Sequence, residues 1–196
     1  MSDIPPPAAG DALLVVDVQN DFLPRGALAV PAGDEVIAAL NRAILEFERR
    51  RLPVFATRDW HPAGHCSFRE QGGPWPSHCV AGSEGAQFPP TLHLPPQVRV
   101  ISKAMRADTD AYSGFDGTDL AAQLRRLGST RVFVGGLATD YCVRATVLDA
   151  LAAGFVAVVL IDAVRGVNVH AGDAERALAE MAARGARMLS TERLVT

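Results

Sequence analysis

The sequence predicts a three-layer α/β/α sandwich built on a six-stranded, mostly parallel sheet. Short apolar runs of strand length alternate with amphipathic stretches of helical length along the chain, a pattern typical of parallel sheets covered on both faces. Right-handed crossovers then place the helices in two layers. With 196 residues, 48% hydrophobic and 21% charged, the chain can bury one large core. We expect a single domain over residues 1–196, with the polar, proline-rich residues 1–10 flexible.

The first half of the chain contains two expected strands, one helix and a long irregular segment. The continuous apolar run 12–16 is typical of a buried strand. Asp34 can cap a helix that runs to about Arg51 and carries an apolar stripe. Residues 53–57 form the second expected strand. No periodic pattern follows from His65 to about Pro96, and a loop of this length inside one domain is often functional.

The second half alternates strands and helices more regularly. A strand at 132–134 leads into a tight Gly135-Gly136 turn, after which Thr139 and Asp140 are good caps for a helix that contains Cys142. The other expected strands are residues 97–102, 155–161 and 186–189, and the helices are 118–127, 139–153 and 172–184.

Ionisable side chains stand directly after four of these strands. They are Asp17, the Asp59/His61 pair, Lys103 and Cys142. Singly, each has an ordinary explanation as a loop carboxylate, a solvated lysine or a small core thiol. Parallel strands end at one edge of the sheet, so the four positions are expected to converge there. A helix N-terminus and an ammonium lower the pKa of a cysteine, and a carboxylate can accept its proton. This edge therefore predicts nucleophilic catalysis by Cys142 with Asp17 and Lys103.

The same edge predicts a metal site. Asp59 and His61 are two residues apart after a strand, so their side chains can point the same way. Together with His78 they suit one divalent ion, Zn²⁺, Fe²⁺ or Mn²⁺. Weaker candidates are Glu70, His65, Cys66 and Cys79. A structural zinc module formed by Cys66, Cys79, His61 and His78 is an alternative.

Composition argues against several other classes of function. The formal net charge is −3 and no large basic block is present, so we expect no nucleic-acid partner. No apolar run approaches the length of a membrane span, and no secretory signal is visible. Three cysteines, an odd number, without such a signal indicate free or metal-associated thiols in a reducing cytoplasm.

Six motifs spread over most of the chain resemble those of the isochorismatase-like cysteine hydrolases and, within them, the nicotinamidase branch. They are residues 16–22, 57–62, 75–79, Lys103, 112–115 and 136–143. The resemblance implies a catalytic triad of Asp17, Lys103 and Cys142, and metal ligands Asp59, His61 and His78, with Glu70 as a weaker fourth. It also implies an oxyanion hole from the backbone of Ala138 and Cys142, with a cis peptide before Ala138. The aromatic side chains of Phe22, Trp75 and Tyr112 would line a ring pocket.

The resemblance also implies an activity. Members of this branch hydrolyse nicotinamide to nicotinate and ammonia in NAD salvage through a cysteine thioester, act on pyrazinamide-like analogues, and often form homo-oligomers. One alternative is a metal-free cysteine amidohydrolase acting on a carbamoyl or ureido substrate. Another is a catalytically silent binding subunit.

Overall fold

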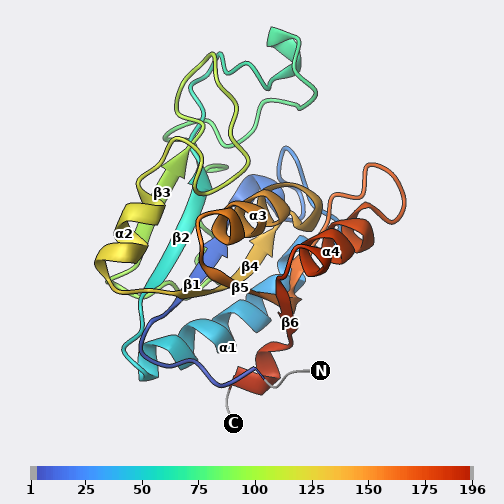
Figure 1. Cartoon of the computed structure of the whole chain (residues 1–196). Helices are drawn as coiled ribbons and strands as arrows, with labels where there is room; N and C mark the ends of the chain where they lie inside the picture. The colour runs from blue at the N-terminus through green and yellow to red at the C-terminus, as the bar shows by residue number, and fades with distance from the viewer. Residues whose placement is uncertain (1–3, 195–196) are drawn as a thin grey trace.

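A computed structural model describes residues 4–194 of the chain. Its centre is a six-stranded sheet with the order β3-β2-β1-β4-β5-β6, in which every neighbouring pair is parallel. The strands are β1 (Asp11–Val16), β2 (Val54–Asp59), β3 (Arg99–Lys103), β4 (Arg131–Leu137), β5 (Val156–Arg165) and β6 (Arg187–Leu189). The predicted three-layer α/β/α architecture is confirmed (Figure 1).

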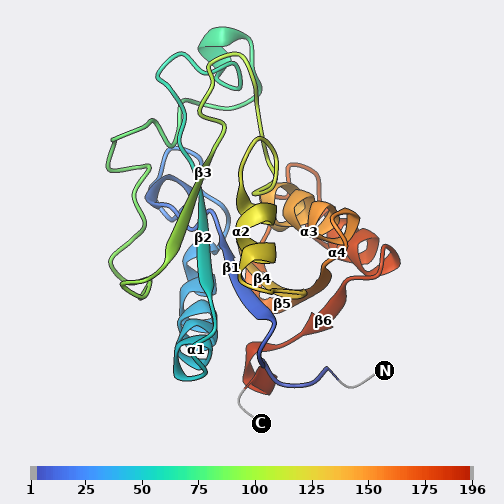
Figure 2. The same cartoon turned by 60° about the vertical axis from the view of Figure 1, so that its left-hand side comes forward.

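The helices lie on both faces of the sheet because the side chains of a strand alternate in direction. Leu13 and Val15 of β1 pack into the core that contains α1, whereas Leu14 and Val16 pack into the core that contains α2, α3 and α4. Figure 2 shows α1 on the opposite side of the sheet from the other three helices. Their bounds are α1 (Val36–Arg49), α2 (Leu120–Arg126), α3 (Arg144–Ala152) and α4 (Asp173–Ala183).

The expected turn at Gly135-Gly136 is wrong, because both glycines belong to β4. Gly136 has a φ of +130°, and a Cβ there would lie 2.0 Å from the backbone oxygen of Val16. Glycine therefore lets β4 approach β1 where a larger residue would clash. The β4–β5 register shifts near this point, and β5 continues to Arg165 rather than ending at residue 161.

The order of the strands creates a switch point between β1 and β4. The chain adds β2 and β3 on one side of β1, then returns and adds β4, β5 and β6 on the other side. Crevices at the carboxyl ends of strands beside such a switch are the usual ligand sites of open parallel sheets. Segment 60–98 contains only a short 3₁₀ turn and isolated bridges. Its first part rises above this edge, and its later part returns past α1 to the start of β3 (Figures 1 and 2).

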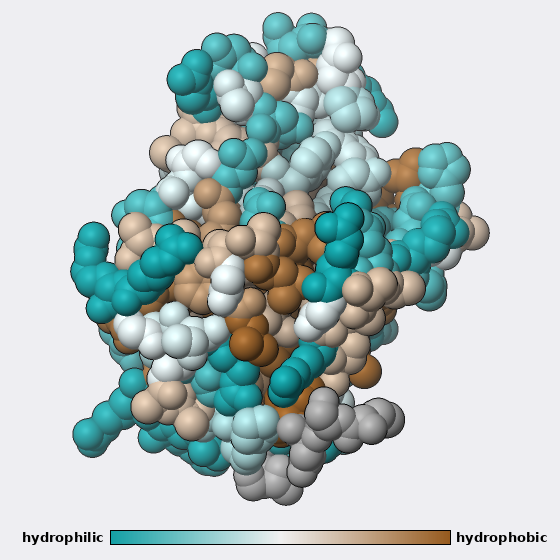
Figure 3. All heavy atoms as spheres, in the orientation of Figure 1, coloured by the Kyte–Doolittle hydropathy of each residue, from teal (hydrophilic) through white to brown (hydrophobic). Residues whose placement is uncertain are grey.

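Residues 1–3 of the segment expected to be flexible lie outside the described residues. In the remainder of that segment, the carbonyl oxygens of Pro5 and Pro6 accept hydrogen bonds from Arg131, and that of Pro7 accepts one from Arg50. Figure 3 shows hydrophilic side chains surrounding a smaller apolar area on the face formed by α2, α3 and α4. None of the helices within residues 4–194 is long and apolar enough to span a membrane.

Candidate active site

Lys103, the last residue of β3, is the centre of a buried group of charges. Its Nζ lies 3.0 Å from Asp17 Oδ2, donates a hydrogen bond to Asp59 Oδ1, and lies 3.6 Å from Cys142 Sγ. A further hydrogen bond, 3.1 Å long, goes to the carbonyl oxygen of Ala111. The four strand-end positions predicted from sequence therefore do converge.

The two carboxylates keep this lysine charged. Burial lowers the pKa of Lys103, but Asp17 and Asp59 more than offset that effect and raise it well above its usual value. Burial also opposes ionisation of Asp59, yet the charge of Lys103 and its hydrogen bond to this carboxylate hold the pKa of Asp59 below its usual range. Lys103 is thus an ammonium and Asp59 a carboxylate at neutral pH.

Asp17 follows β1 and is fully buried. Thr57 of the neighbouring strand donates a 2.6 Å hydrogen bond to Asp17 Oδ1, because the β1–β2 register sets Thr57 beside the end of β1. Burial raises the pKa of Asp17, only partly opposed by Lys103. A raised pKa makes this carboxyl a stronger proton acceptor, as a general base requires.

Cys142 lies in a different local structure from the one predicted. Residues Thr139–Val143 form a π-helical turn before α3, and no side chain caps its N-terminus. Asp140, one of the expected caps, instead accepts hydrogen bonds from the backbone N–H groups of Val167 and Asn168, 2.9 and 2.8 Å long. The expectation of caps at Thr139 and Asp140 is therefore wrong, because the segment after β5 takes the Asp140 carboxylate.

The prediction that the Cys142 pKa is lowered is also wrong for the protein without substrate or metal. Burial raises the pKa of Cys142 well above its usual value, and Lys103 offsets only part of this effect. A hydrogen bond with Asp17 further favours the neutral thiol. The resting cysteine is therefore a thiol, and a neighbouring base must remove its proton during attack.

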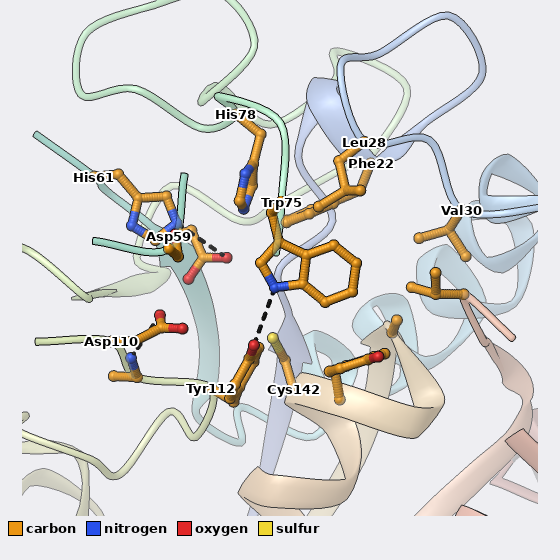
Figure 4. Close-up of a pocket in the computed structure, with 15 residues that line it drawn as sticks. Phe22, Leu28, Val30, Asp59, His61, Trp75, His78, Asp110, Tyr112 and Cys142 are labelled. Atoms are coloured by element: carbon orange, nitrogen blue, oxygen red, sulfur yellow. Dashed lines mark hydrogen bonds and ion pairs between the residues drawn. The ribbon is translucent and has the colours of Figure 1, made fainter. Parts of the chain in front are cut away.

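The second cluster is formed by Asp59, His61 and His78, whose ligand atoms lie within 4.8 Å of one another (Figure 4). The Nδ1 atoms of His61 and His78 face the carbonyl oxygens of Ala104 and Pro76 at 3.3 and 2.8 Å. A carbonyl only accepts, so each Nδ1 carries the proton and each Nε2 keeps a lone pair.

His61 Nε2 supplies the test of whether these residues fit a metal. This atom is buried and has no hydrogen-bond partner among the described residues. Burial lowers the pKa of His61 to about 4, so the imidazole is neutral and able to coordinate. A carboxylate and two imidazoles, one of which has a buried nitrogen without a partner, fit a divalent cation.

The weaker metal candidates do not join this cluster within residues 4–194. Glu70 is exposed on a short 3₁₀ turn. Cys66 and Cys79 are free thiols that belong neither to the group around Lys103 nor to the Asp59, His61 and His78 cluster. Burial raises the pKa of Cys79. The structural zinc module considered from sequence therefore has no geometric support.

Cys142 of the first cluster and Asp59, His61 and His78 of the second line one cavity of about 440 Å³, solvent at its mouth included, whereas Asp17 and Lys103 are buried behind this lining. Phe22, Trp75 and Tyr112 line it as predicted, and Trp75 Nε1 donates a 3.0 Å hydrogen bond to the Tyr112 hydroxyl (Figure 4). Ala138 and Cys142 also line the cavity, and the Leu137–Ala138 peptide is cis. The lining residues that sequence reasoning missed are Leu28, Val30, Ser67, Asp110, Ala111, Tyr141 and Val167.

Gln19 is a further residue whose role sequence reasoning missed. Its buried carboxamide accepts a hydrogen bond from the Asp59 N–H and donates one to the Asp59 carbonyl, both 2.8 Å long. A second donated bond, 2.9 Å long, goes to the carbonyl of Ala86. The loop after β1 thus carries two residues of the site. Asp17 lies beside the Cys142 thiol, and Gln19 holds the backbone of the candidate metal ligand Asp59.

Comparison with known proteins agrees with this geometry. The Isochorismatase domain model matches residues 11–193. The chain belongs to the isochorismatase family. The Escherichia coli nicotinamidase is 43% identical over an alignment that covers 90% of this chain and 93% of the relative.

Solved structures show the same similarity. The pyrazinamidase of Pyrococcus horikoshii in complex with zinc is 52% identical, with a TM-score of 0.89 over 92% of this chain and 99% of that one. PnC1 from L. infantum in complex with nicotinate is 37% identical, with a TM-score of 0.88 over 96% of both chains.

Proposed function

We propose that this protein is a nicotinamidase that hydrolyses nicotinamide to nicotinate and ammonia in NAD salvage, and that also accepts the analogue pyrazinamide. The observation that carries the proposal is one aromatic cavity lined by Cys142 and by a three-ligand metal cluster, with Lys103 in contact with both Cys142 and Asp17. Support comes from relatives named nicotinamidase and from structures of related proteins with zinc or nicotinate bound.

The proposed reaction begins with transfer of the Cys142 proton to Asp17 as sulfur attacks the carboxamide carbon. Lys103 offsets the negative charge that moves between the sulfur and the carboxylate. The backbone N–H groups of Ala138 and Cys142 are proposed to hold the oxyanion. Asp17 returns the proton to the departing nitrogen, so ammonia leaves and a thioester remains on Cys142.

Asp17 then accepts a proton from water, which attacks the thioester. The C–S bond breaks, Asp17 returns its proton to the Cys142 sulfur, and nicotinic acid leaves and loses its own proton to solvent as nicotinate. The walls formed by Phe22, Trp75 and Tyr112 hold a flat ring beside the sulfur. One divalent ion held by Asp59, His61 and His78 would supply a Lewis acid for the ring nitrogen of the substrate. Zn²⁺, Fe²⁺ and Mn²⁺ all suit this ligand set.

The test is ammonia release from nicotinamide by purified protein, measured before chelation, after chelation and after metal is returned. We expect release that is lost on chelation and restored by the metal. Release that persists without metal would favour the metal-free amidohydrolase, and release only from carbamoyl or ureido substrates would replace the proposal. No release from any of these substrates would favour the silent binding subunit.

We further propose that the enzyme acts in the cytoplasm as a homo-oligomer. The three cysteines are free thiols, which suits a reducing compartment. Light scattering at several protein concentrations tests the oligomer, and a mass equal to that of one 20.8 kDa chain throughout would contradict it.

A further inference from the structure

The rings of His61, His65 and His78 lie close together, but only His61 and His78 belong to the metal cluster. The ring centroid of His61 lies 4.2 Å from that of His65 and 4.9 Å from that of His78. His65 is fully buried yet is not one of the three candidate ligands. The hydrogen bonds of His65 explain the difference.

Both ring nitrogens of His65 have partners that determine its tautomer. Nε2 lies 3.1 Å from the carbonyl oxygen of Thr109, which can only accept, so Nε2 carries the proton. Nδ1 accepts a 3.3 Å hydrogen bond from the backbone N–H of Ser67, so Nδ1 carries none. The lone pair of His65 Nδ1 therefore faces Ser67.

This tautomer also determines the direction of the Ser67 hydroxyl. Ser67 Oγ lies 2.8 Å from His65 Nδ1, and since Nδ1 has no proton, the hydroxyl must donate its only one. The remaining lone pairs of Oγ can then only accept hydrogen bonds. Ser67 is 4% exposed and lines the same cavity as Asp59, His61 and His78.

We propose that Ser67 is a positioning residue that accepts a hydrogen bond from a water completing the coordination of the bound ion. The proposal rests on the metal site of the proposed function. Three protein ligands leave coordination positions for water, and the hydrogens of such a water need acceptors. Removing a residue that hydrogen-bonds to a ligand of the metal changes metal affinity by about 10- to 100-fold.

The test is the Zn²⁺ dissociation constant, measured by chelator competition on the full chain. The matched control is Ser113→Ala, because Ser113 is also 4% exposed and its Oγ also takes part in a hydrogen bond, from Phe115 N–H at 3.1 Å, but it lies outside the cavity lining. We expect Ser67→Ala to weaken Zn²⁺ binding about 10-fold or more. Ser113→Ala should bind Zn²⁺ as the unsubstituted chain does.

Thermal unfolding of the metal-free proteins separates this role from a structural one. Ser67→Ala should melt close to Ser113→Ala, because the Ser67 backbone N–H still serves His65 Nδ1. Unchanged Zn²⁺ affinity in Ser67→Ala, or a metal-free form that melts well below the control, would overturn the role of Ser67. An unsubstituted chain that binds no Zn²⁺ would instead overturn the metal site of the proposed function itself.

Discussion

The two halves of the candidate site are built from different kinds of backbone. Asp17, Lys103 and Cys142 follow or end regular strands, and the parallel sheet brings them together at the β1/β4 switch point. His61 and His78 instead lie in segment 60–98, where isolated bridges such as His61↔Val80 replace regular strands. The sheet thus positions the thiol chemistry, whereas hydrogen bonds within a long segment position the imidazoles.

The two halves also differ in how their buried polar groups are satisfied. The Lys103 ammonium contacts both Asp17 and Asp59, so the charges of the first half are balanced by the protein itself. Asp17 Oδ2 and, in the second half, His61 Nε2 are both buried without a hydrogen-bond partner among residues 4–194, but Asp17 Oδ2 lies 3.0 Å from the Lys103 ammonium. Unpaired buried polar atoms are rare, so this difference indicates that the second half is completed by an external cation. Asp59 belongs to both halves and joins them.

The largest effect is expected when the nucleophile is removed. Cys142→Ala should lower kcat by at least about 10⁴-fold, because no other thiol reaches the reacting carbon. Metal content, measured by atomic emission, should not change, since Cys142 is not one of the Asp59, His61 and His78 ligands. Cys66→Ala, at a half-buried thiol outside both clusters, is the control and should keep full activity. Loss of metal from Cys142→Ala would mean that the two halves are not separable.

Removing the central ammonium should give the next largest effect. Lys103→Met leaves the Asp17 and Asp59 carboxylates buried without their cation, which should lower the free energy of unfolding by about 3–5 kcal/mol. Denaturant titration measures this loss. It should be smaller in mild acid, where an uncompensated carboxylate, its pKa raised by burial, takes up a proton.

The control for that variant is Arg144→Met, which breaks the partly exposed Arg144–Glu180 pair. Such a pair contributes little to the free energy of unfolding, because water and salt screen the two charges. An equal loss of unfolding free energy in Lys103→Met and Arg144→Met would show that Lys103 does not balance the charges of the Asp17 and Asp59 carboxylates.

A smaller effect is expected at the metal half. His61→Ala removes the unpartnered Nε2 and should weaken metal binding by at least about 100-fold, because a direct ligand contributes more than an outer-shell partner. Chelator competition measures the affinity, with the exposed His93→Ala as control. Turnover of nicotinamide should fall in parallel. Full activity of a metal-free His61→Ala protein would show that the reaction does not require the metal.

The smallest predicted effect concerns the hydrogen bond that holds the base. Thr57→Val keeps the shape of the side chain but removes the 2.6 Å hydrogen bond to Asp17. The free energy of unfolding should fall by about 2 kcal/mol, as expected for a buried hydrogen bond to a charged group. Thr130→Val is the control, because its 3.5 Å hydrogen bond to Gly10 is exposed. A loss no greater than that of the control would argue against Thr57 as a support for Asp17.

Sequence reasoning worked best where position along a strand determines position in space. The places of Asp17, Lys103 and Cys142 followed from the rule that parallel strands end at one edge. The roles of Thr57 and Gln19 depend on strand register and on the path of a loop, neither of which has a local signal. The direction of the Cys142 pKa was missed because burial depends on the packing of the whole domain.

The most direct test of the account is metal-dependent binding of nicotinamide to Cys142→Ala, a variant that keeps the cavity and the metal ligands but cannot cleave. Calorimetry would compare nicotinamide with benzamide, which lacks the ring nitrogen, in metal-loaded and chelated protein. The account predicts that nicotinamide loses at least about 10-fold in affinity on chelation, about 1.4 kcal/mol, whereas benzamide binding does not change. Equal loss for both ligands, or for neither, would contradict the division of the cavity into a thiol half and a metal half.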